Sequence, residues 1–170
     1  MAELMPVERL QPFLLDRLTD DQPDRSVESR DKRVMSPRDF RNAILRDLAW
    51  LMNTGSHPKR DGLEEYPEVA KSVLNYGMPS LSGMTASSVT TDAIERTVRD
   101  AILAYEPRIL KKSLKVIVSR AQDDAAAYVI RLEIRGEVWN VPMSEALFIR
   151  TEVDLDTGQW KLSSDSSQSG

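Results

Sequence analysis

Hydrophobic residues recur with the 3.6-residue spacing of an α-helix in two long segments of this chain. Residues 36–53 begin with a serine that suits the N-cap position, followed by a proline at the first helical position. Residues 92–105 form the second such segment, with Asp92 as the predicted cap, and they end just before a proline. A shorter helix is predicted over residues 67–74.

Beyond residue 108 the spacing of apolar residues changes from 3.6 to 2, which is typical of half-buried β-strands. Gly136 interrupts one of these strands and predicts a bulge or bend. Residues 156–158, Asp-Thr-Gly, predict a hairpin turn. Strands are expected at residues 114–119, 128–135, 147–155 and 159–162. Helices followed by consecutive strands indicate an α+β fold, with N-terminal helices packed on one face of a C-terminal antiparallel β-sheet, a meander.

The sequence divides into three parts. Residues 1–35 hold a small apolar anchor, which includes Phe13 and Leu14, and a charged linker with few apolar side chains. Such a linker buries too little apolar surface to offset the entropy of ordering it, so the anchor is expected to be tethered, docking on its own domain or on a partner. Residues 36–162 form the main domain, and residues 163–170 form a polar tail that we expect to be disordered.

Composition excludes several classes of function. The chain has 27 acidic and 23 basic side chains interleaved along its 170 residues, which gives no basic footprint for nucleic acid. Because it has no cysteine and one histidine, His57, in a predicted loop, we expect no disulfide, no metal site and no cofactor. No signal peptide and no apolar run of roughly 18 residues is evident, so a cytoplasmic protein without membrane insertion is expected.

Trp50 lies beside the apolar stripe of the first long helix. It could complete the core or contact another chain. Core packing is favoured, because large aromatic side chains in helices are usually packed.

A stiff corner, Glu106-Pro107-Arg108, joins the second long helix to the first strand. Proline ends the helix and favours an extended conformation for Glu106. The arginine presents a planar fork of donors suited to carboxylates or carbonyls. Two interpretations stay open on these residues alone: a docking element for another protein, or a helix stop with a surface ion pair.

Five blocks of sequence resemble a known family. The chain is similar to TssE-type subunits of the type VI secretion baseplate, within the "lysozyme-like" group of contractile-tail baseplate wedge proteins. The similarity covers nearly all of the chain except its last eight residues, and it is carried by residues 14–21, 44–53, 66–79, 106–108 and 147–158.

The resemblance implies a structural role, not an enzymatic one. A protein of this kind would dock to the wedge subunits TssF, TssG and TssK and would template the sheath proteins TssB and TssC by strand addition. We accordingly expect Arg108→Ala to abolish sheath assembly without unfolding the chain. The residues expected to bind partners are Glu106, Pro107, Arg108, Leu147, Ile149, Arg150, Thr151 and Val153.

The family label also suggests an alternative, a peptidoglycan-cleaving glycoside hydrolase. That chemistry needs two carboxyl groups on either side of a cleft, one of them with a raised pKa. Glu106 is the candidate acid, and Asp123, Asp124 or Glu133 is the candidate partner. No spacing in the sequence fixes such a pair, and the acidic residues are spread over loops and solvent-facing positions.

Overall fold

A computed structural model of the chain describes residues 12–19, 23–24, 35–57, 62–81, 90–120, 129–139 and 145–164. The helices are α1 (Leu14–Leu18), α2 (Pro37–Asn53), α3 (Pro67–Ala70) and α4 (Thr91–Tyr105), with short 3-10 turns η4 (Leu63–Glu65) and η5 (Val73–Asn75) on either side of α3. The strands are β1 (Lys115–Arg120), β2 (Val129–Val138), β3 (Glu145–Asp154) and β4 (Trp160–Ser164).

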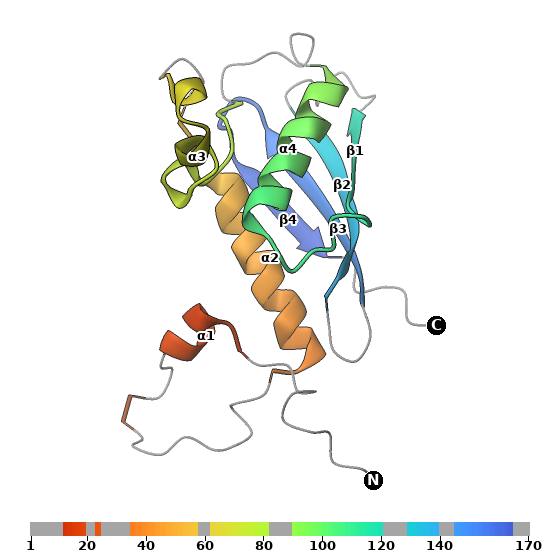
Figure 1. Cartoon of the computed structure of the whole chain (residues 1–170). Helices are drawn as coiled ribbons and strands as arrows, with labels where there is room; N and C mark the ends of the chain where they lie inside the picture. The colour runs from red at the N-terminus through yellow and green to blue at the C-terminus, as the bar shows by residue number, and fades with distance from the viewer. Residues whose placement is uncertain are drawn as a thin grey trace.

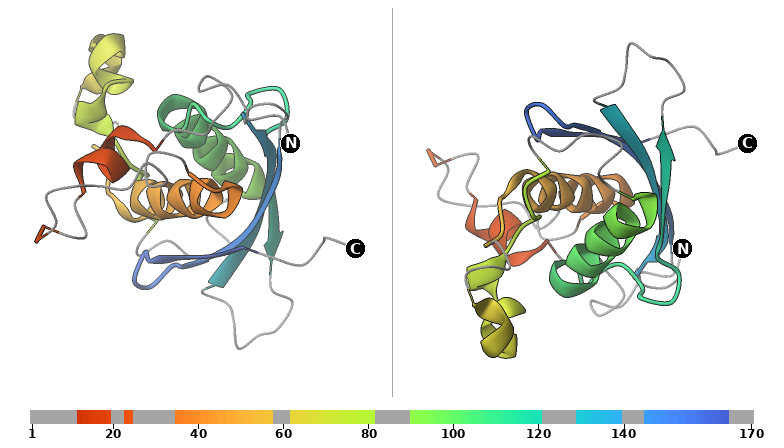
Figure 2. Two further views of the ribbon diagram at one scale, coloured as in Figure 1. Left: turned by 90° about the horizontal axis from the view of Figure 1, so that it is seen from below. Right: turned by 90° about the horizontal axis from the view of Figure 1, so that it is seen from above.

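The strands form one antiparallel sheet of order β1-β2-β3-β4, and α2 and α4 cover one of its faces (Figure 1). Figure 2 shows the sheet from its ends, with both long helices on the same side and α1 and α3 farther from it. The predicted α+β fold, helices on one face of an antiparallel meander, is confirmed.

The two long helices begin close to the predicted positions. Ser36 is the N-cap of α2, and its Oγ accepts a hydrogen bond of 3.1 Å from the amide of Asp39. Helix α4 begins at Thr91 with Thr90 at its N-cap, so the predicted cap, Asp92, is wrong. Asp92 instead lies in the first turn, where a negative charge is favoured by the helix dipole.

The helix predicted over residues 67–74 is interrupted. Helix α3 ends at Ala70, and a 3-10 turn follows at Val73–Asn75. The hydroxyl of Ser72 accepts a hydrogen bond from the amide of Leu74 and caps this second turn, an arrangement that competes with a continuous helix.

The core lies between α2, α4 and the inner face of the sheet. Alternate residues of β2 and β3 face it, so that Leu132, Ile134, Ile149 and Val153 are at most 1% exposed. Of the bulge or bend predicted at Gly136, the bulge is wrong, because this residue pairs with Leu147 in an uninterrupted register, and the bend stays a prediction. Its lack of a side chain has another cause: a Cβ there would lie 3.1 Å from Cγ2 of Ile109.

The N-terminal segment contacts the domain through Phe13 and Asp16, and its contact with α2 includes an aromatic pair. The ring centroid of Phe13 lies 5.0 Å from that of Phe40 on α2, whereas Leu14 and Leu18 of α1 are 71% and 74% exposed. Most of the predicted linker lies outside the described residues. At the other end, β4 continues to Ser164, so the boundary predicted after residue 162 falls inside a strand.

Within the described residues, none of the helices combines the length and apolar character needed to cross a membrane.

Candidate partner-docking site

The Glu106-Pro107-Arg108 corner is fixed at both ends by backbone hydrogen bonds. The amide of Glu106 caps α4 by donating to the carbonyl of Ile102 at 2.8 Å. The carbonyl of Arg108 accepts from the amide of Trp139 at 2.8 Å, just beyond the end of β2. The corner is therefore a rigid connection between a helix and the sheet, as the sequence predicts.

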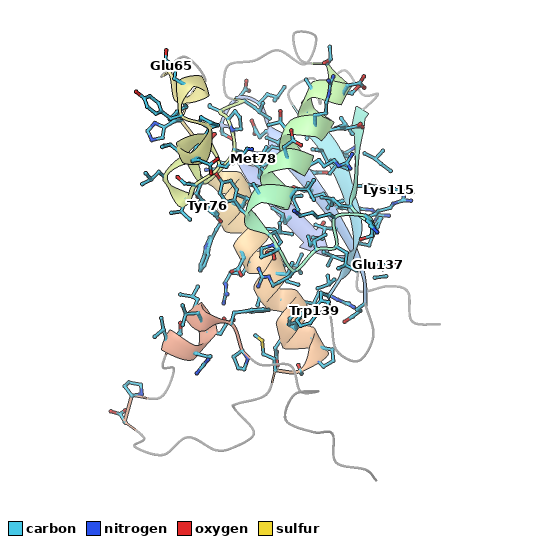
Figure 3. The ribbon with its side chains drawn as sticks, in the orientation of Figure 1. Glu65, Tyr76, Met78, Lys115, Glu137 and Trp139 are labelled. Atoms are coloured by element: carbon cyan, nitrogen blue, oxygen red, sulfur yellow. The ribbon has the colours of Figure 1, made fainter. Side chains whose placement is uncertain are left out.

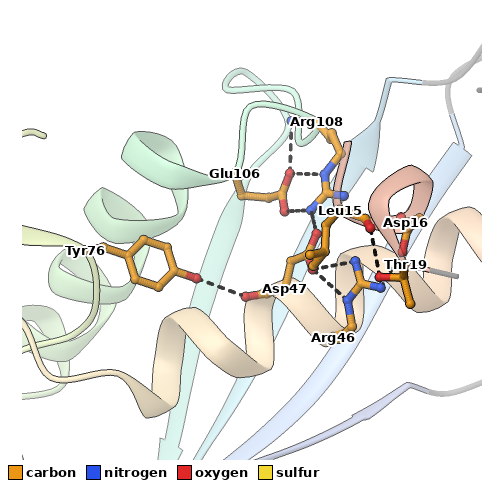
Figure 4. Close-up of polar contacts among 8 residues, drawn as sticks. All are labelled: Leu15, Asp16, Thr19, Arg46, Asp47, Tyr76, Glu106 and Arg108. Atoms are coloured by element: carbon orange, nitrogen blue, oxygen red, sulfur yellow. Dashed lines mark hydrogen bonds and ion pairs between the residues drawn. The ribbon is translucent and has the colours of Figure 1, made fainter. Parts of the chain in front are cut away.

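The acid and the arginine of the corner bind each other, and the arginine also binds a side chain of α2. The guanidinium of Arg108 donates to both carboxylate oxygens of Glu106 and, at 2.7 Å, to Oδ2 of Asp47 on α2 (Figure 4). The side chains of Glu106 and Arg108 are only 3% and 14% exposed. The interpretation as a surface ion pair is thus wrong, because the pair is largely removed from water.

A second arginine extends this network to the N-terminal segment. Arg46 of α2 forms ion pairs with Asp47 and with Asp16 of α1 (Figure 4). The guanidinium of Arg108 also lies 4.2 Å from the ring centroid of Phe13, a cation–π contact. Three segments that are distant in the sequence therefore meet at one cluster, which we call the arginine cluster: Asp16, Arg46, Asp47, Glu106 and Arg108.

The charges of the cluster support one another electrostatically. Burial by itself would lower the pKa of Arg108, but hydrogen bonds and charges from Glu106 and Asp47 more than offset it and raise that pKa above its ordinary value. The hydrogen bond that Arg46 donates to Asp16 likewise raises the pKa of Arg46, against a smaller effect of burial. Both guanidinium groups are therefore charged at neutral pH.

Tyr76 approaches the cluster from the loop after η5, and its hydroxyl lies 3.5 Å from the carbonyl oxygen of Asp47 (Figures 3 and 4). Burial, followed by the negative charges of Asp47 and Glu106, raises the pKa of Tyr76 above its ordinary value. The phenol is therefore held in its neutral form beside two carboxylates.

Most of the partner-binding residues predicted on the strand after residue 145 face the core. Four of them lie on inward positions of β3 and are at most 3% exposed: Leu147, Ile149, Thr151 and Val153. β3 is an inner strand, with β2 on one side and β4 on the other. A partner-binding role for these four side chains stays a prediction. In the folded chain they pack in the hydrophobic core.

Arg150 differs from its neighbours on β3. Its side chain is 57% exposed on the outer face of the sheet, and its guanidinium lies 5.4 Å from the ring centroid of Phe148. Pro107 is likewise exposed at the corner. Of the predicted partner-binding residues, these two are the ones open to a contact with another protein.

The geometry does not assemble the carboxyl pair of the hydrolase alternative. Glu106 binds Arg108, which in turn binds Asp47 of α2 on the helix-covered side of the sheet. Glu133 lies on the outer face, 2.6 Å from a guanidinium nitrogen of Arg135. Asp123 and Asp124 lie outside the described residues. The sheet thus separates Glu106 from Glu133, and the two cannot flank one cleft.

Metal chemistry finds no support in the described part of the chain, where no group of three or more His, Asp or Glu side chains could hold a metal ion. His57 lies in a loop, and its backbone amide donates to Oδ1 of Asn75 at 2.9 Å.

Exposed apolar side chains gather on α3, on η5 and at Trp50. Trp50 is 50% exposed and stacks on Arg46 at 5.1 Å, so the prediction that it packs in the core is wrong. Val73 and Leu74 are 80% and 71% exposed. Large apolar side chains left in water mark interaction surfaces. The exposure of Val73 and Leu74 could not be predicted from the sequence, because the apolar residues of 67–74 fit the buried face of one continuous helix.

The fold is α+β, with a rigid corner whose acid and arginine pair with each other, and the comparison with known families gives the class of protein. The family model for baseplate wedge protein gp25 matches residues 38–143, more than half of the chain. The chain therefore belongs to the gp25 family of baseplate wedge proteins and is TssE-like.

One solved structure is similar at a lower level. It is a provisionally assigned tail lysozyme from Geobacter sulfurreducens, with 17% identity and a TM-score of 0.41, covering 79% of this chain and 98% of that one. A likeness of this size carries no argument about activity. No curated protein matches the chain significantly.

Proposed function

We propose that this chain is a structural baseplate component of a type VI secretion system. In this role it docks to the wedge subunits TssF, TssG and TssK and templates polymerisation of the contractile sheath from TssB and TssC. It works in the cytoplasm, with the baseplate held near the inner face of the cytoplasmic membrane. The observation that carries the proposal is the gp25 family match over residues 38–143.

Docking to the wedge is supported by the rigid corner and by the exposed apolar side chains near it. The arginine cluster holds the corner in one conformation before any partner arrives, so little entropy is lost on binding. Pro107 and the exposed Trp50, Val73 and Leu74 offer contact area with low polarity. Of these, Trp50 is of the residue type that most often carries a large share of the binding energy once a partner buries it.

Sheath templating is supported by the topology of the sheet. A four-stranded meander has two outer strands, β1 and β4, and each presents backbone groups along one side. Strand addition uses such groups for affinity and uses alternating side chains for specificity. Among the described residues, no fifth strand pairs with either outer strand.

The proposal is tested by capturing purified TssF, TssG and TssK on the immobilised chain and measuring peptidoglycan release by the same sample. Capture without release supports a structural component. Release that disappears in Glu106→Gln, with no subunit captured, would instead establish the hydrolase.

A conservative variant addresses the corner itself. Arg108→Lys keeps a positive charge beside Glu106 but loses the planar fork and most of the cation–π contact with Phe13. If the corner sets the wedge-binding geometry, this variant binds the wedge at least tenfold more weakly while staying folded. Wild-type binding by a folded Arg108→Lys would remove the corner from the docking surface.

A further inference from the structure

Each outer strand of the sheet has a backbone group that a helix side chain satisfies. On β1, the amide of Val118 donates to Oε1 of Glu95 on α4 at 2.8 Å. On β4, the amide of Trp160 donates to Oδ1 of Asn53 at 3.0 Å, and Nδ2 of Asn53 donates back to the carbonyl of Trp160 at 3.1 Å. These contacts show which backbone groups point away from the sheet.

Asn53 imitates one residue of a neighbouring strand. Its carboxamide has the same donor and acceptor as a peptide group, and it makes the paired hydrogen bonds of an antiparallel ladder with Trp160. Because Asn53 is the last residue of α2, the helix extends this imitation no farther along β4.

The next edge positions of β4 follow from the alternation of the antiparallel ladder. Since the amide and carbonyl of Trp160 point away from β3, those of Leu162 and Ser164 point the same way. In the described part of the chain, β3 is the one strand that pairs with β4. The outward groups of Leu162 and Ser164 are therefore placed to receive an added strand directly beyond Asn53.

The β1 edge is less accessible. Val118 lies in the middle of the strand, so the hydrogen bond that its amide donates to Glu95 occupies the centre of any ladder that could form there. Helix α4 packs along β1 as α2 packs along β4, so the two edges differ in where the helix side chain bonds and not in helix cover. An incoming strand would have to displace the Glu95 carboxylate from the Val118 amide. Breaking that hydrogen bond costs free energy before any new one forms.

We propose that an extended segment of a partner chain adds to the β4 edge and not to the β1 edge, in a register set by Asn53. The inference rests on the proposed function, in which a sheath subunit supplies the segment. Leu162 is partly buried against the core, so the segment needs an apolar residue on that side. Lys161 lies on the outer face, where a carboxylate in the segment would pair with it.

The outer face beside this edge agrees with an acidic segment. A shallow hollow crosses β2, β3 and β4, and its cationic side chains are Arg131, Arg150 and Lys161. Its glutamates pair with arginines, Glu152 with Arg131 and Glu133 with Arg135 and Arg150, and Lys161 on β4 is its cation next to the edge. The partner class is therefore a strand that alternates acidic and apolar residues.

The test is amide hydrogen exchange of the full chain, alone and with purified TssB and TssC. Strand addition at β4 slows exchange of the Leu162 and Ser164 amides at least tenfold, and it leaves those of Val116 and Val118 unchanged. Slowing at Val116 and Val118 instead would overturn the choice of edge while leaving sheath binding intact. Absence of sheath binding altogether would overturn the proposed function, and this inference with it.

A matched pair of variants gives an independent readout. Leu162→Pro removes an outward amide that β3 does not use, a position at which an outer strand tolerates proline. Val116→Pro makes the same change on the outward side of β1. Sheath affinity is expected to fall at least tenfold for the first variant and less than twofold for the second, and the reverse order would overturn the inference. If either variant fails to fold, the exchange rates of the unmodified chain decide.

Discussion

Replacing Arg108 with alanine leaves a buried carboxylate without its partner. Glu106 is 3% exposed, and both of its carboxylate oxygens accept hydrogen bonds from the Arg108 guanidinium. Arg108→Ala also removes the 2.7 Å hydrogen bond to Asp47 and the cation–π contact with Phe13. The expectation from the sequence, that this variant leaves the fold intact, is therefore replaced by one of substantial destabilisation.

The expected loss is about 3 kcal/mol in the free energy of unfolding. Removing one partner of a buried ion pair costs about 3–5 kcal/mol, and the remaining 14% exposure of the Arg108 side chain favours the lower end. For a chain of this size, about 3 kcal/mol corresponds to a decrease of roughly 6–12 °C in the melting temperature. The assay is thermal and urea unfolding followed by circular dichroism.

Arg131→Ala is the matched control. Arg131 also pairs with one glutamate, Glu152, but these two side chains are 54% and 49% exposed. An ion pair this exposed contributes about 0–1 kcal/mol. If Arg108→Ala costs no more than Arg131→Ala, the arginine cluster does not stabilise the corner and the reasoning is refuted.

Three further predictions concern other parts of the fold. Tyr105→Phe removes hydrogen bonds of 3.0 Å from the phenol to two backbone carbonyls and should cost about 1 kcal/mol in urea unfolding. Burial raises the pKa of Tyr105, so the phenol contributes fully to the free energy of unfolding below its ordinary pKa near 10 and loses this contribution at higher pH. The variant should therefore lose stability less steeply than the wild type as pH rises above about 10. The same dependence of stability on alkaline pH in both proteins would contradict this. A hydrogen bond from the backbone of Thr157, followed by other backbone and side-chain bonds, lowers the pKa of Asp154, so Asp154→Ala should destabilise the turn at pH 7 and the difference should shrink as pH falls below about 3.8. A difference in stability between Asp154→Ala and the wild type that persists at pH 2 would show that this carboxylate is not the cause. Gly77→Ala should cost about 3 kcal/mol or more, because φ is 125° and a Cβ would lie 2.3 Å from a backbone oxygen. Gly62→Ala, with φ of 75° and open space, should cost about 1 kcal/mol, and equal melting temperatures of the two variants would refute the steric argument.

The regular elements were predictable because their signals are local. The spacing of apolar residues along 36–53 and the serine-proline start depend on neighbours within a few positions, and α2 forms there. The Asp-Thr-Gly turn likewise forms, with Gly158 at a φ of 71°. Period-2 alternation located the inward positions of β2 and β3 correctly.

The same alternation could not distinguish a core position from a binding position. Leu147 to Val153 match the family in sequence, but an apolar side chain on a strand looks the same whether it packs inward or binds a partner. Only the packing of α2 and α4 on this face shows that these side chains are covered, and only the strand order shows that β3 has no free edge.

The arginine cluster and the hydrogen bonds of Asn53 and Glu95 to the outer strands depend on contacts between residues far apart in the sequence, which no local pattern predicts. Asp47 reaches Arg108 across 61 positions in sequence, and Asn53 reaches Trp160 across 107. Asp47 reads as a solvent-facing residue of α2, and Asn53 as a helix stop. An alternative signal existed for Trp50, because Arg46 lies four positions earlier, on the same helix face, where it can stack on the indole.

The most direct measurement of the central claim is sheath nucleation in a reconstituted system. Fluorescent TssB and TssC are mixed with the wedge subunits TssF, TssG and TssK, with or without this chain, and the number of sheath polymers is counted. The account predicts polymers attached to wedges when the chain is present and few without it. Equal numbers in both samples would show that the chain does not template the sheath.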